Sequence, residues 1–276
     1  MPKSRKKGSK GKMKKLQRLK ELENEKRRAL VIKNAMYKPD GESEDTVKNT
    51  LADFAAFTKY SRNGLDISIE FSSGMAMDVE TRQRTFDVLK DNMKQMYDKS
   101  GWGWSDRKKM NEHTDSSARF LVARNIQGEV IGFTQFRFLI EKNYEVLYIF
   151  ELQVAMNGRR CGLGRHMMQI CELMARKNEM KFVMLTVFKN NVAAMNFYRN
   201  KMKYELDEIS PSECGDDTAD YEILSKCVDP ALKKLRQLDQ KNNNRSNNNV
   251  TKQQKQAHRQ PLGDINANQL TPSKIL

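Results

Sequence analysis

The fold is decided by one stretch of the chain, NGRRCGLGRHM, which runs from Asn157 to Met167. A β-rich run, YEVLYIFELQV (144–154), precedes it, and apolar residues at helical spacing follow it. A glycine turn between strand and helix suits phosphate, because the backbone can approach closely and the first helical N–H groups are unpaired. The sequence therefore predicts an anion-binding turn, although a G-x-G turn alone is equally compatible with a tight corner.

Two common phosphate-binding motifs do not fit the spacing of this turn. No Gly-Lys-Ser/Thr follows, as a Walker loop requires, and Met167 occupies the position of the third glycine in the dinucleotide fingerprint. The remaining pattern is Arg159-x-x-Gly162-x-Gly164.

The flanking patterns indicate a mixed α/β fold. Residues 81–100 have apolar side chains at three- and four-residue steps, which predicts an amphipathic helix. Two strand-like runs around residues 125–128 predict a hairpin, and the apolar run 181–188 predicts a strand buried on both faces. A helix in NVAAMNFYRNKM and strands in KYELDE and DYEIL follow. The order predicts a mostly antiparallel sheet with one parallel βαβ step across the glycine turn.

The net charge of +15 is unevenly distributed over the 276 residues. Residues 1–38 carry 15 Lys and Arg against 3 Asp and Glu, and residues 226–276 carry 10 against 3. The intervening residues hold 25 basic against 29 acidic side chains, a net −4. A mildly acidic core favours a cationic ligand over nucleic acid.

Composition divides the chain into three parts. Residues 1–38 form a basic, helix-favouring segment, interpreted as a nuclear-import signal or an electrostatic anchor, with a solvated tail as the alternative. Residues 39–228 form the folded domain. Residues 229–276 are Asn/Gln-rich and poor in aromatic residues, so we expect a disordered tail.

Several kinds of site are not expected. The 4 cysteines show no C-x-x-C spacing and the chain has 3 histidines, so we expect no metal and a reducing compartment. No apolar run approaches the roughly 18 residues of a membrane span, and none has the form of the apolar region of a signal peptide, so we expect neither. We expect a soluble monomer in the nucleus and cytoplasm.

Two motifs in order resemble the GCN5-related N-acetyltransferase (GNAT) superfamily. The pattern Arg159-x-x-Gly162-x-Gly164 is similar to its pyrophosphate loop, and KNNVAAMNFYRNKMKYEL is similar to the helix and strand that close over coenzyme A. Blocks such as NGLDISIE, MYDKSGWGWSDRKK and SPS…YEILS narrow the resemblance to the NatD type of N-alpha-acetyltransferase over roughly residues 50–226. The resemblance implies acetyl-CoA as cosubstrate. It also implies the free N-terminal amine of histones four and two-A, which begin Ser-Gly-Arg-Gly, as acceptor.

The resemblance also assigns the donor site. Backbone amides of one run would hold the pyrophosphate: Arg160, Cys161, Gly162, Leu163, Gly164, Arg165 and His166. Gln153, Val154 and Ala155 would pair with the pantetheine arm, and an N–H near Val154 would face the oxyanion. Asn191 and Tyr198 would contact the coenzyme.

Deprotonation of the amine needs only a modest base. An α-amino group titrates near ~7.7–8.0, whereas a lysine side chain titrates near ~10.4. Glu151 is the candidate acceptor, with Tyr148 close by. Strand alternation places these two residues on opposite faces, so a bulge or a water must bring them together. A strand carboxylate paired with a neighbouring cation is the alternative for Glu151.

Peptide contacts come from aromatic and acidic positions. Tyr97 and Trp102 would wall the channel, Tyr221 would close it, and Thr186 would contact the peptide. The segment Leu139, Ile140 and Glu141 would also contact the peptide. Leu139 occupies the position of an aspartate in the family, and Glu141 would bind the arginine of the peptide in its place. Phe150 stands where a second tyrosine is expected.

Other functions stay open at this point. A lysine side-chain acetyltransferase would use the same donor, and a non-catalytic histone-tail or RNA-binding protein could use the same fold. Ribosome or chromatin association through the basic tails is also left open.

Overall fold

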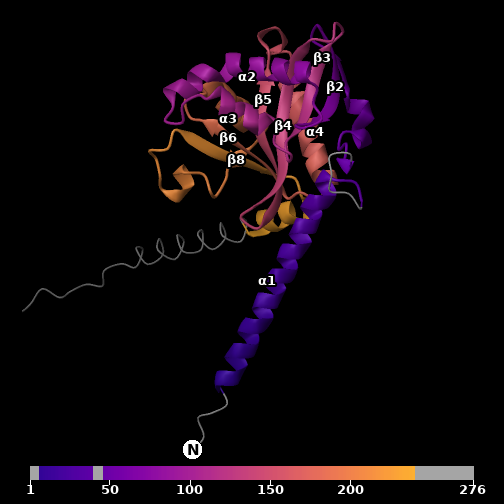
Figure 1. Cartoon of the computed structure of the whole chain (residues 1–276). Helices are drawn as coiled ribbons and strands as arrows, with labels where there is room; N and C mark the ends of the chain where they lie inside the picture. The colour runs from indigo at the N-terminus through magenta and orange to yellow at the C-terminus, as the bar shows by residue number, and fades with distance from the viewer. Residues whose placement is uncertain (1–5, 40–45, 240–276) are drawn as a thin grey trace, which may run out of the picture. The chain divides into compact units, whose positions relative to one another are not determined.

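The structure is a computed structural model that describes residues 6–39 and 46–239 (Figure 1). In these residues one sheet has the strand order β1-β2-β3-β4-β5-β6-β8-β7. The β5–β6 pair is parallel and the other neighbours are antiparallel, which confirms the predicted mixed α/β fold. The strands are β1 (Lys59–Arg62), β2 (Leu65–Ser73), β3 (Arg119–Asn125), β4 (Val130–Glu141), β5 (Tyr144–Val154), β6 (Phe182–Phe188), β7 (Glu205–Leu206) and β8 (Tyr221–Cys227).

Side-chain caps start several of the helices. Asp78 accepts the Thr81 N–H before α2, Ser105 accepts the Lys108 N–H before α3, and Asn191 accepts the Ala194 N–H before α5. A π-helical turn, η4 (Phe197–Lys201), continues α5. The helices are α1 (Lys6–Met36), α2 (Val79–Lys99), α3 (Asp106–His113), α4 (Leu163–Lys177) and α5 (Val192–Asn196), and the 3-10 segments are η2 (Ala52–Phe57), η3 (Met156–Gly158) and η5 (Ser212–Cys214).

Apolar clusters cover both faces of the sheet. On one face, Leu147 and Ile149 of β5 pack with α4, which contributes Met167 to the same cluster. On the other face, Leu89 of α2 packs with Phe133 of β4 and its neighbours. In β6, Val183, Leu185 and Val187 belong to the first cluster, and the alternate residues Phe182, Met184 and Phe188 are also buried, which explains the apolar character of this strand.

The basic N-terminal segment joins the folded domain through the end of α1. Ala35 is buried in the larger apolar cluster, and Arg27 pairs with the buried carboxylate of Glu145 at 3.0 Å. Arg28 donates to the Asn143 side chain at 3.1 Å. The predicted boundary at residue 38 therefore falls after residues that already pack on the sheet. Residues 1–5, which open the proposed import signal, lie outside the described residues.

The first residues of the tail that was predicted to be disordered form a helix in the structure. Residues 230–239 are helical. Pro230 suits the first position of a helix, and the Ala, Leu, Lys and Arg residues that follow are good helix formers. Residues 240–276 lie outside the described part of the chain. Among the described residues, no helix combines the length and apolar character needed to cross a membrane.

Two irregularities in β5 shape the site. Its parallel register with β6 runs from Val146–Phe182 to Ile149–Leu185, whereas β5 continues to Val154. The two strands therefore diverge at their carboxyl ends. The register with β4 also shifts, because Gln135 pairs with Glu151 whereas Phe136 pairs with Ile149, which leaves Phe150 as an extra residue.

Candidate active site

The glycine turn begins α4 in a conformation that exposes its first amides. Gly162 is the N-cap at φ 89, a left-handed value that favours glycine. The first helical hydrogen bond runs from His166 N to Gly162 O at 3.1 Å. The N–H groups of the three residues between them, 163–165, have no acceptor within the helix, and the positive end of the helix dipole adds to their attraction for an anion.

The β1–β2 hairpin supports the turn from behind. The Tyr60 hydroxyl donates to the Cys161 carbonyl at 2.5 Å, and the Asn63 amide donates to the same oxygen at 2.8 Å. The Tyr60 ring also contacts the His166 ring, with 4.9 Å between centroids. The His166 ring nitrogen Nε2 bonds to the Phe57 carbonyl at 2.8 Å. The side chain of His166 and the carbonyl of Cys161 thus face the hairpin.

Arg159 fixes the opposite end of the turn. Its guanidinium donates to the Val154 carbonyl at 3.1 Å and also to the Asn92 side chain. Asn92 in turn donates to the Gln153 side chain at 2.9 Å and to the Val154 carbonyl at 3.2 Å. This network ties α2, the end of β5 and the turn together.

A cavity of about 690 Å³ opens beside the turn, and we call it the basic cavity. Arg159, Arg160, Arg165 and Lys201 contribute four cationic side chains to its lining. The predicted coenzyme residues in its wall are Gln153, Val154, Arg160, Gly162, Leu163, Gly164, Arg165, Asn191 and Tyr198.

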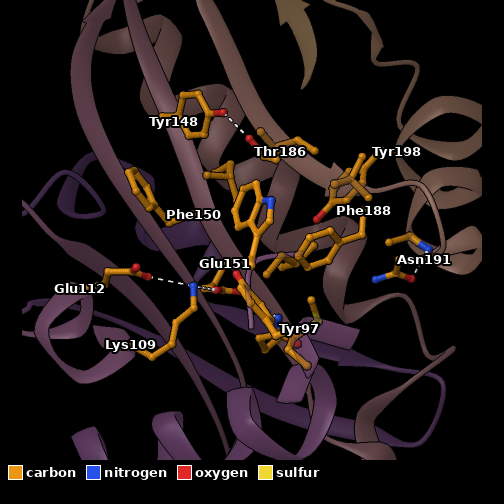
Figure 2. Close-up of a pocket in the computed structure, with 18 of the residues that line it drawn as sticks. Tyr97, Lys109, Glu112, Tyr148, Phe150, Glu151, Thr186, Phe188, Asn191 and Tyr198 are labelled. Atoms are coloured by element: carbon orange, nitrogen blue, oxygen red, sulfur yellow. Dashed lines mark hydrogen bonds and ion pairs between the residues drawn. The ribbon is translucent and has the colours of Figure 1, made fainter. Parts of the chain in front are cut away.

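A second cavity, of about 450 Å³, lies where β5 and β6 diverge, and we call it the acidic cavity. Three carboxylates, those of Glu112, Glu141 and Glu151, line it together with one ammonium, that of Lys109 (Figure 2). The two cavities share wall residues, so they meet inside the fold. The shared residues are Met93, Leu152, Gln153, Asn191, Ala194 and Tyr198.

The bulge in β5 places Glu151 on the same side as Tyr148. Without an extra residue, alternation would direct the two side chains to opposite faces of the sheet. Because Phe150 is inserted opposite β4, both Tyr148 and Glu151 line the acidic cavity. Of the two routes expected from the sequence, a bulge or a water, the fold contains the bulge.

Glu151 is buried and held at both oxygens. Its side chain is 6% exposed, and Lys109 Nζ lies 3.3 Å from its Oε1. Gln153 Nε2 donates to its Oε2 at 2.9 Å. Burial raises the pKa of Glu151 above the usual range of a carboxyl, while Lys109 and Gln153 act in the opposite direction. The carboxylate is therefore both paired with a cation and positioned in the cavity wall.

Lys109 connects several groups of the acidic cavity. Its ammonium lies 2.8 Å from Glu112 Oε2 and 4.5 Å from the centre of the Tyr97 ring. Burial is the largest single influence and opposes its charge, but Glu151, Tyr97 and Glu112 together outweigh burial, so the pKa of Lys109 is raised. Burial also raises the pKa of Tyr97 to about 12.

Tyr148 and Thr186 join the two diverging strands across the cavity (Figure 2). Their hydroxyl oxygens are 2.6 Å apart. Burial raises the pKa of Tyr148, so its hydroxyl stays protonated at neutral pH. The neighbouring Phe150 ring lies 5.5 Å from Tyr148 and 4.4 Å from the Arg137 guanidinium.

Aromatic side chains form the remaining wall of the acidic cavity. Phe188 of β6 contacts Tyr97 at 5.0 Å and Trp102 at 5.4 Å between ring centroids. Trp102 is 51% exposed and contacts Tyr221 at 5.2 Å on its other side. Tyr221 thus supports Trp102 from outside the cavity lining.

The structure separates the predicted residues into cavity-lining and outlying groups. In addition to those named above, Leu139 lines the acidic cavity. Ile140 is 43% exposed, because alternation along β4 turns it away from its two neighbours. The Ala155 amide bonds to the Ile131 carbonyl at 2.8 Å. The predicted residues outside both cavity linings are Ile140, Ala155, Cys161, His166 and Tyr221.

Several site residues were not predicted from the sequence. They include Lys109, Glu112 and Phe188 of the acidic cavity and the supporting residues Tyr60 and Asn92. The i,i+3 spacing of Lys109 and Glu112 is a weak signal for an ion pair, but it does not indicate Glu151 as a third member. Within residues 6–39 and 46–239, no group of three or more His, Cys, Asp or Glu side chains has the arrangement of a metal site.

A family model and a protein of known name are similar to parts of this chain. The model of the acetyltransferase (GNAT) family matches residues 82–204, which include the turn and the lining residues of both cavities. The chain is similar to N-alpha-acetyltransferase daf-31 of Caenorhabditis elegans, with 31% identity over 97 residues. That match covers 34% of this chain and 53% of the relative, so the chain spans about half the length of this relative.

Solved structures with a similar fold share little sequence with this chain. Ard1 from Thermoplasma volcanium has 17% identity and a TM-score of 0.43 over 58% of this chain and 97% of its own. The paia N-acetyltransferase from Thermoplasma acidophilum, solved with coenzyme A, has 18% identity and a TM-score of 0.43 over 58% and 99%.

Proposed function

Since the model of the acetyltransferase (GNAT) family matches residues 82–204, we propose that this protein transfers an acetyl group from acetyl-CoA to the free N-terminal amine of a peptide. The acceptor that fits best is the Ser-Gly-Arg-Gly start of histones four and two-A. The observation that carries this proposal is that two cavities meet inside the fold, one lined by cationic side chains and the other mainly by carboxylates.

The basic cavity fits the diphosphate of coenzyme A. Gly162 has the left-handed conformation that brings the backbone close to a ligand, and the first amides of α4 lack helical acceptors. The cationic side chains Arg160 and Arg165 add long-range attraction for phosphate. When bound, acetyl-CoA supplies an activated thioester, and residues shared by the two cavities lie where its arm would pass.

The acidic cavity fits a cationic peptide end. Glu112, Glu141 and Glu151 outnumber Lys109, so the lining has a net negative charge. Glu151 lies beside Tyr148 at the divergence of β5 and β6 and is positioned to accept the proton of the amine. An α-amine titrates near ~7.7–8.0, so a carboxylate can remove its proton, whereas a lysine side chain near ~10.4 is far harder to deprotonate.

Specificity for the first residues follows from the walls of the acidic cavity. The rings of Tyr97, Trp102 and Phe188 pack against one another in this wall, and we expect them to favour a small first residue over a long side chain. Glu141 offers a carboxylate to an arginine further along the peptide. These contacts support the Ser-Gly-Arg-Gly assignment.

A comparison of two peptides tests the proposal. The protein is incubated with acetyl-CoA and a histone-four N-terminal peptide, either free or formylated at its amine, and the products are mapped by tandem mass spectrometry. We expect acetyl on the α-amine of the free peptide and none on the formylated one. Acetylation of lysine in both peptides would instead establish a side-chain acetyltransferase, and binding without transfer would establish a non-catalytic histone-tail protein.

A further inference from the structure

Lys109 occupies a position that the proposed transfer reaction does not account for. It projects from α3 into the acidic cavity, with 12% of its side chain exposed (Figure 2). Its ammonium contacts carboxylates on two different elements, Glu112 of α3 and Glu151 of β5. A buried lysine is unfavourable unless its charge is paired, and its ammonium would also repel the cationic substrate proposed for this cavity. Its position is therefore explained best by its pairing with the carboxylate beside it.

The two partners of Lys109 differ in their surroundings. Glu112 is 40% exposed, so solvent stabilises its charge without help. Glu151 is 6% exposed, and its charge depends on the groups around it. Gln153 contacts one oxygen of Glu151 and Lys109 contacts the other, which leaves the remaining lone pairs for a substrate proton or water.

The titratable groups that face Glu151 come from three elements. Lys109 and Glu112 approach from α3, Tyr97 from α2 and Tyr198 from η4. Lys109 is the cation of this set. Burial keeps both phenols protonated, so neither can replace its charge.

We propose that Lys109 is the positioning residue that keeps Glu151 ionised and oriented to accept the proton of the substrate amine. The part of this inference that concerns catalysis rests on the proposed function. The effect of Lys109 on the ionisation of Glu151 does not depend on the reaction. Loss of the Lys109 charge leaves a buried carboxylate beside Glu112, and such a carboxylate takes up a proton at higher pH. A protonated Glu151 cannot accept the amine proton.

Direct titration of Glu151 tests the inference without any substrate. Protein labelled with ¹³C at the glutamate side-chain carboxyl is followed by NMR over pH, and the spectrum of Glu151→Gln identifies the Glu151 signal. We expect Lys109→Met to move the Glu151 midpoint upward by more than about one pH unit. Lys109→Arg should keep it near that of the unmodified protein. A midpoint that Lys109→Met leaves unchanged would overturn the inference.

Two further variants make the test independent of how Lys109→Met folds. Lys108→Met removes the same charge from an exposed neighbour on α3, and we expect no shift of the Glu151 midpoint. Glu112→Gln changes a half-exposed side chain and should lower the Glu151 midpoint. The substitution removes a nearby negative charge, and the Lys109 ammonium then has Glu151 as its remaining carboxylate partner. A midpoint that rises or stays constant in Glu112→Gln would contradict the inference.

Kinetics separates this role from a structural one. The ratio of kcat/KM for Lys109→Met to that of the unmodified protein cancels the titration of the substrate amine. We expect the ratio to fall about tenfold for each pH unit between the new Glu151 midpoint and that of the unmodified protein, and to level off at lower pH. A ratio that is low but independent of pH would mean that Lys109 only holds α3 in place. A completely inactive unmodified protein would refute the proposed function and leave the NMR result standing.

Discussion

Replacement of Gly162 by alanine tests whether the shape of the glycine turn determines coenzyme binding. A Cβ at this position would lie 2.6 Å from the Tyr60 hydroxyl, and the residue has φ +89. The left-handed conformation costs a residue with a side chain about 1–2 kcal/mol. Displacement of the Tyr60 hydroxyl from the Cys161 carbonyl costs roughly 0.5–1.5 kcal/mol more.

The sum, about 1.5–3.5 kcal/mol, should appear as lost affinity. A strained turn relaxes in the free protein, and ligand binding must restore it. At about 1.4 kcal/mol for each tenfold change, Gly162→Ala should weaken coenzyme A binding by roughly 10- to 300-fold. Isothermal titration calorimetry with coenzyme A measures this directly.

Two matched variants identify the cause. Gly164→Ala adds the same methyl two residues later, where the nearest atoms lie at 3.8 Å, so its affinity should stay within about threefold. In Tyr60→Phe/Gly162→Ala the obstructing hydroxyl is gone and the next atoms lie at 3.8 Å, so part of the affinity should return. Equal losses for both glycines, or no loss at Gly162, would refute the reasoning.

Three other perturbations have defined outcomes. Glu151→Gln should lower kcat, and most at acidic pH, where the substrate amine carries its proton; a uniform loss in the pH–rate profile would argue against a proton acceptor. Tyr148→Phe removes the bond to Thr186, and because burial raises the pKa of Tyr148, the rate should fall without displacement of the pH profile, which stopped-flow or steady-state assays check. Burial lowers the pKa of His113 from 6.5 to about 4, so the unfolded chain binds the extra proton first. The free energy of unfolding should have its full value above about pH 6.5 and fall by up to about 3 kcal/mol toward pH 4. His113→Phe should reduce this pH dependence, which urea denaturation curves measure.

The elements around the glycine turn could be predicted because their signals are local. The helical spacing after Gly162 and the apolar run of β6 each lie within one element, and the structure has both where the sequence indicated them. The N-terminal strands β1 and β2 were not assigned as strands. Their role, the support of the turn by Tyr60, depends on contacts 101 residues apart in sequence.

The acidic cavity was only partly predictable for related reasons. Alternation showed that Tyr148 and Glu151 need a bulge or a water, but an inserted residue has no signature of its own in the sequence. The partner of Glu151 lies 42 residues away on another element, and so Lys109 could not be identified. The same alternation rule, applied to β4, already separates Ile140 from its neighbours Leu139 and Glu141.

The short seam between β5 and β6 has a consequence for how the two ligands influence each other. Four residue pairs join the strands, and beyond them each strand continues with a different neighbour. A molecule between the diverging ends touches both parts of the sheet and limits changes in their angle. Occupation of either cavity should therefore increase affinity at the other, and by thermodynamic reciprocity the two enhancements must be equal.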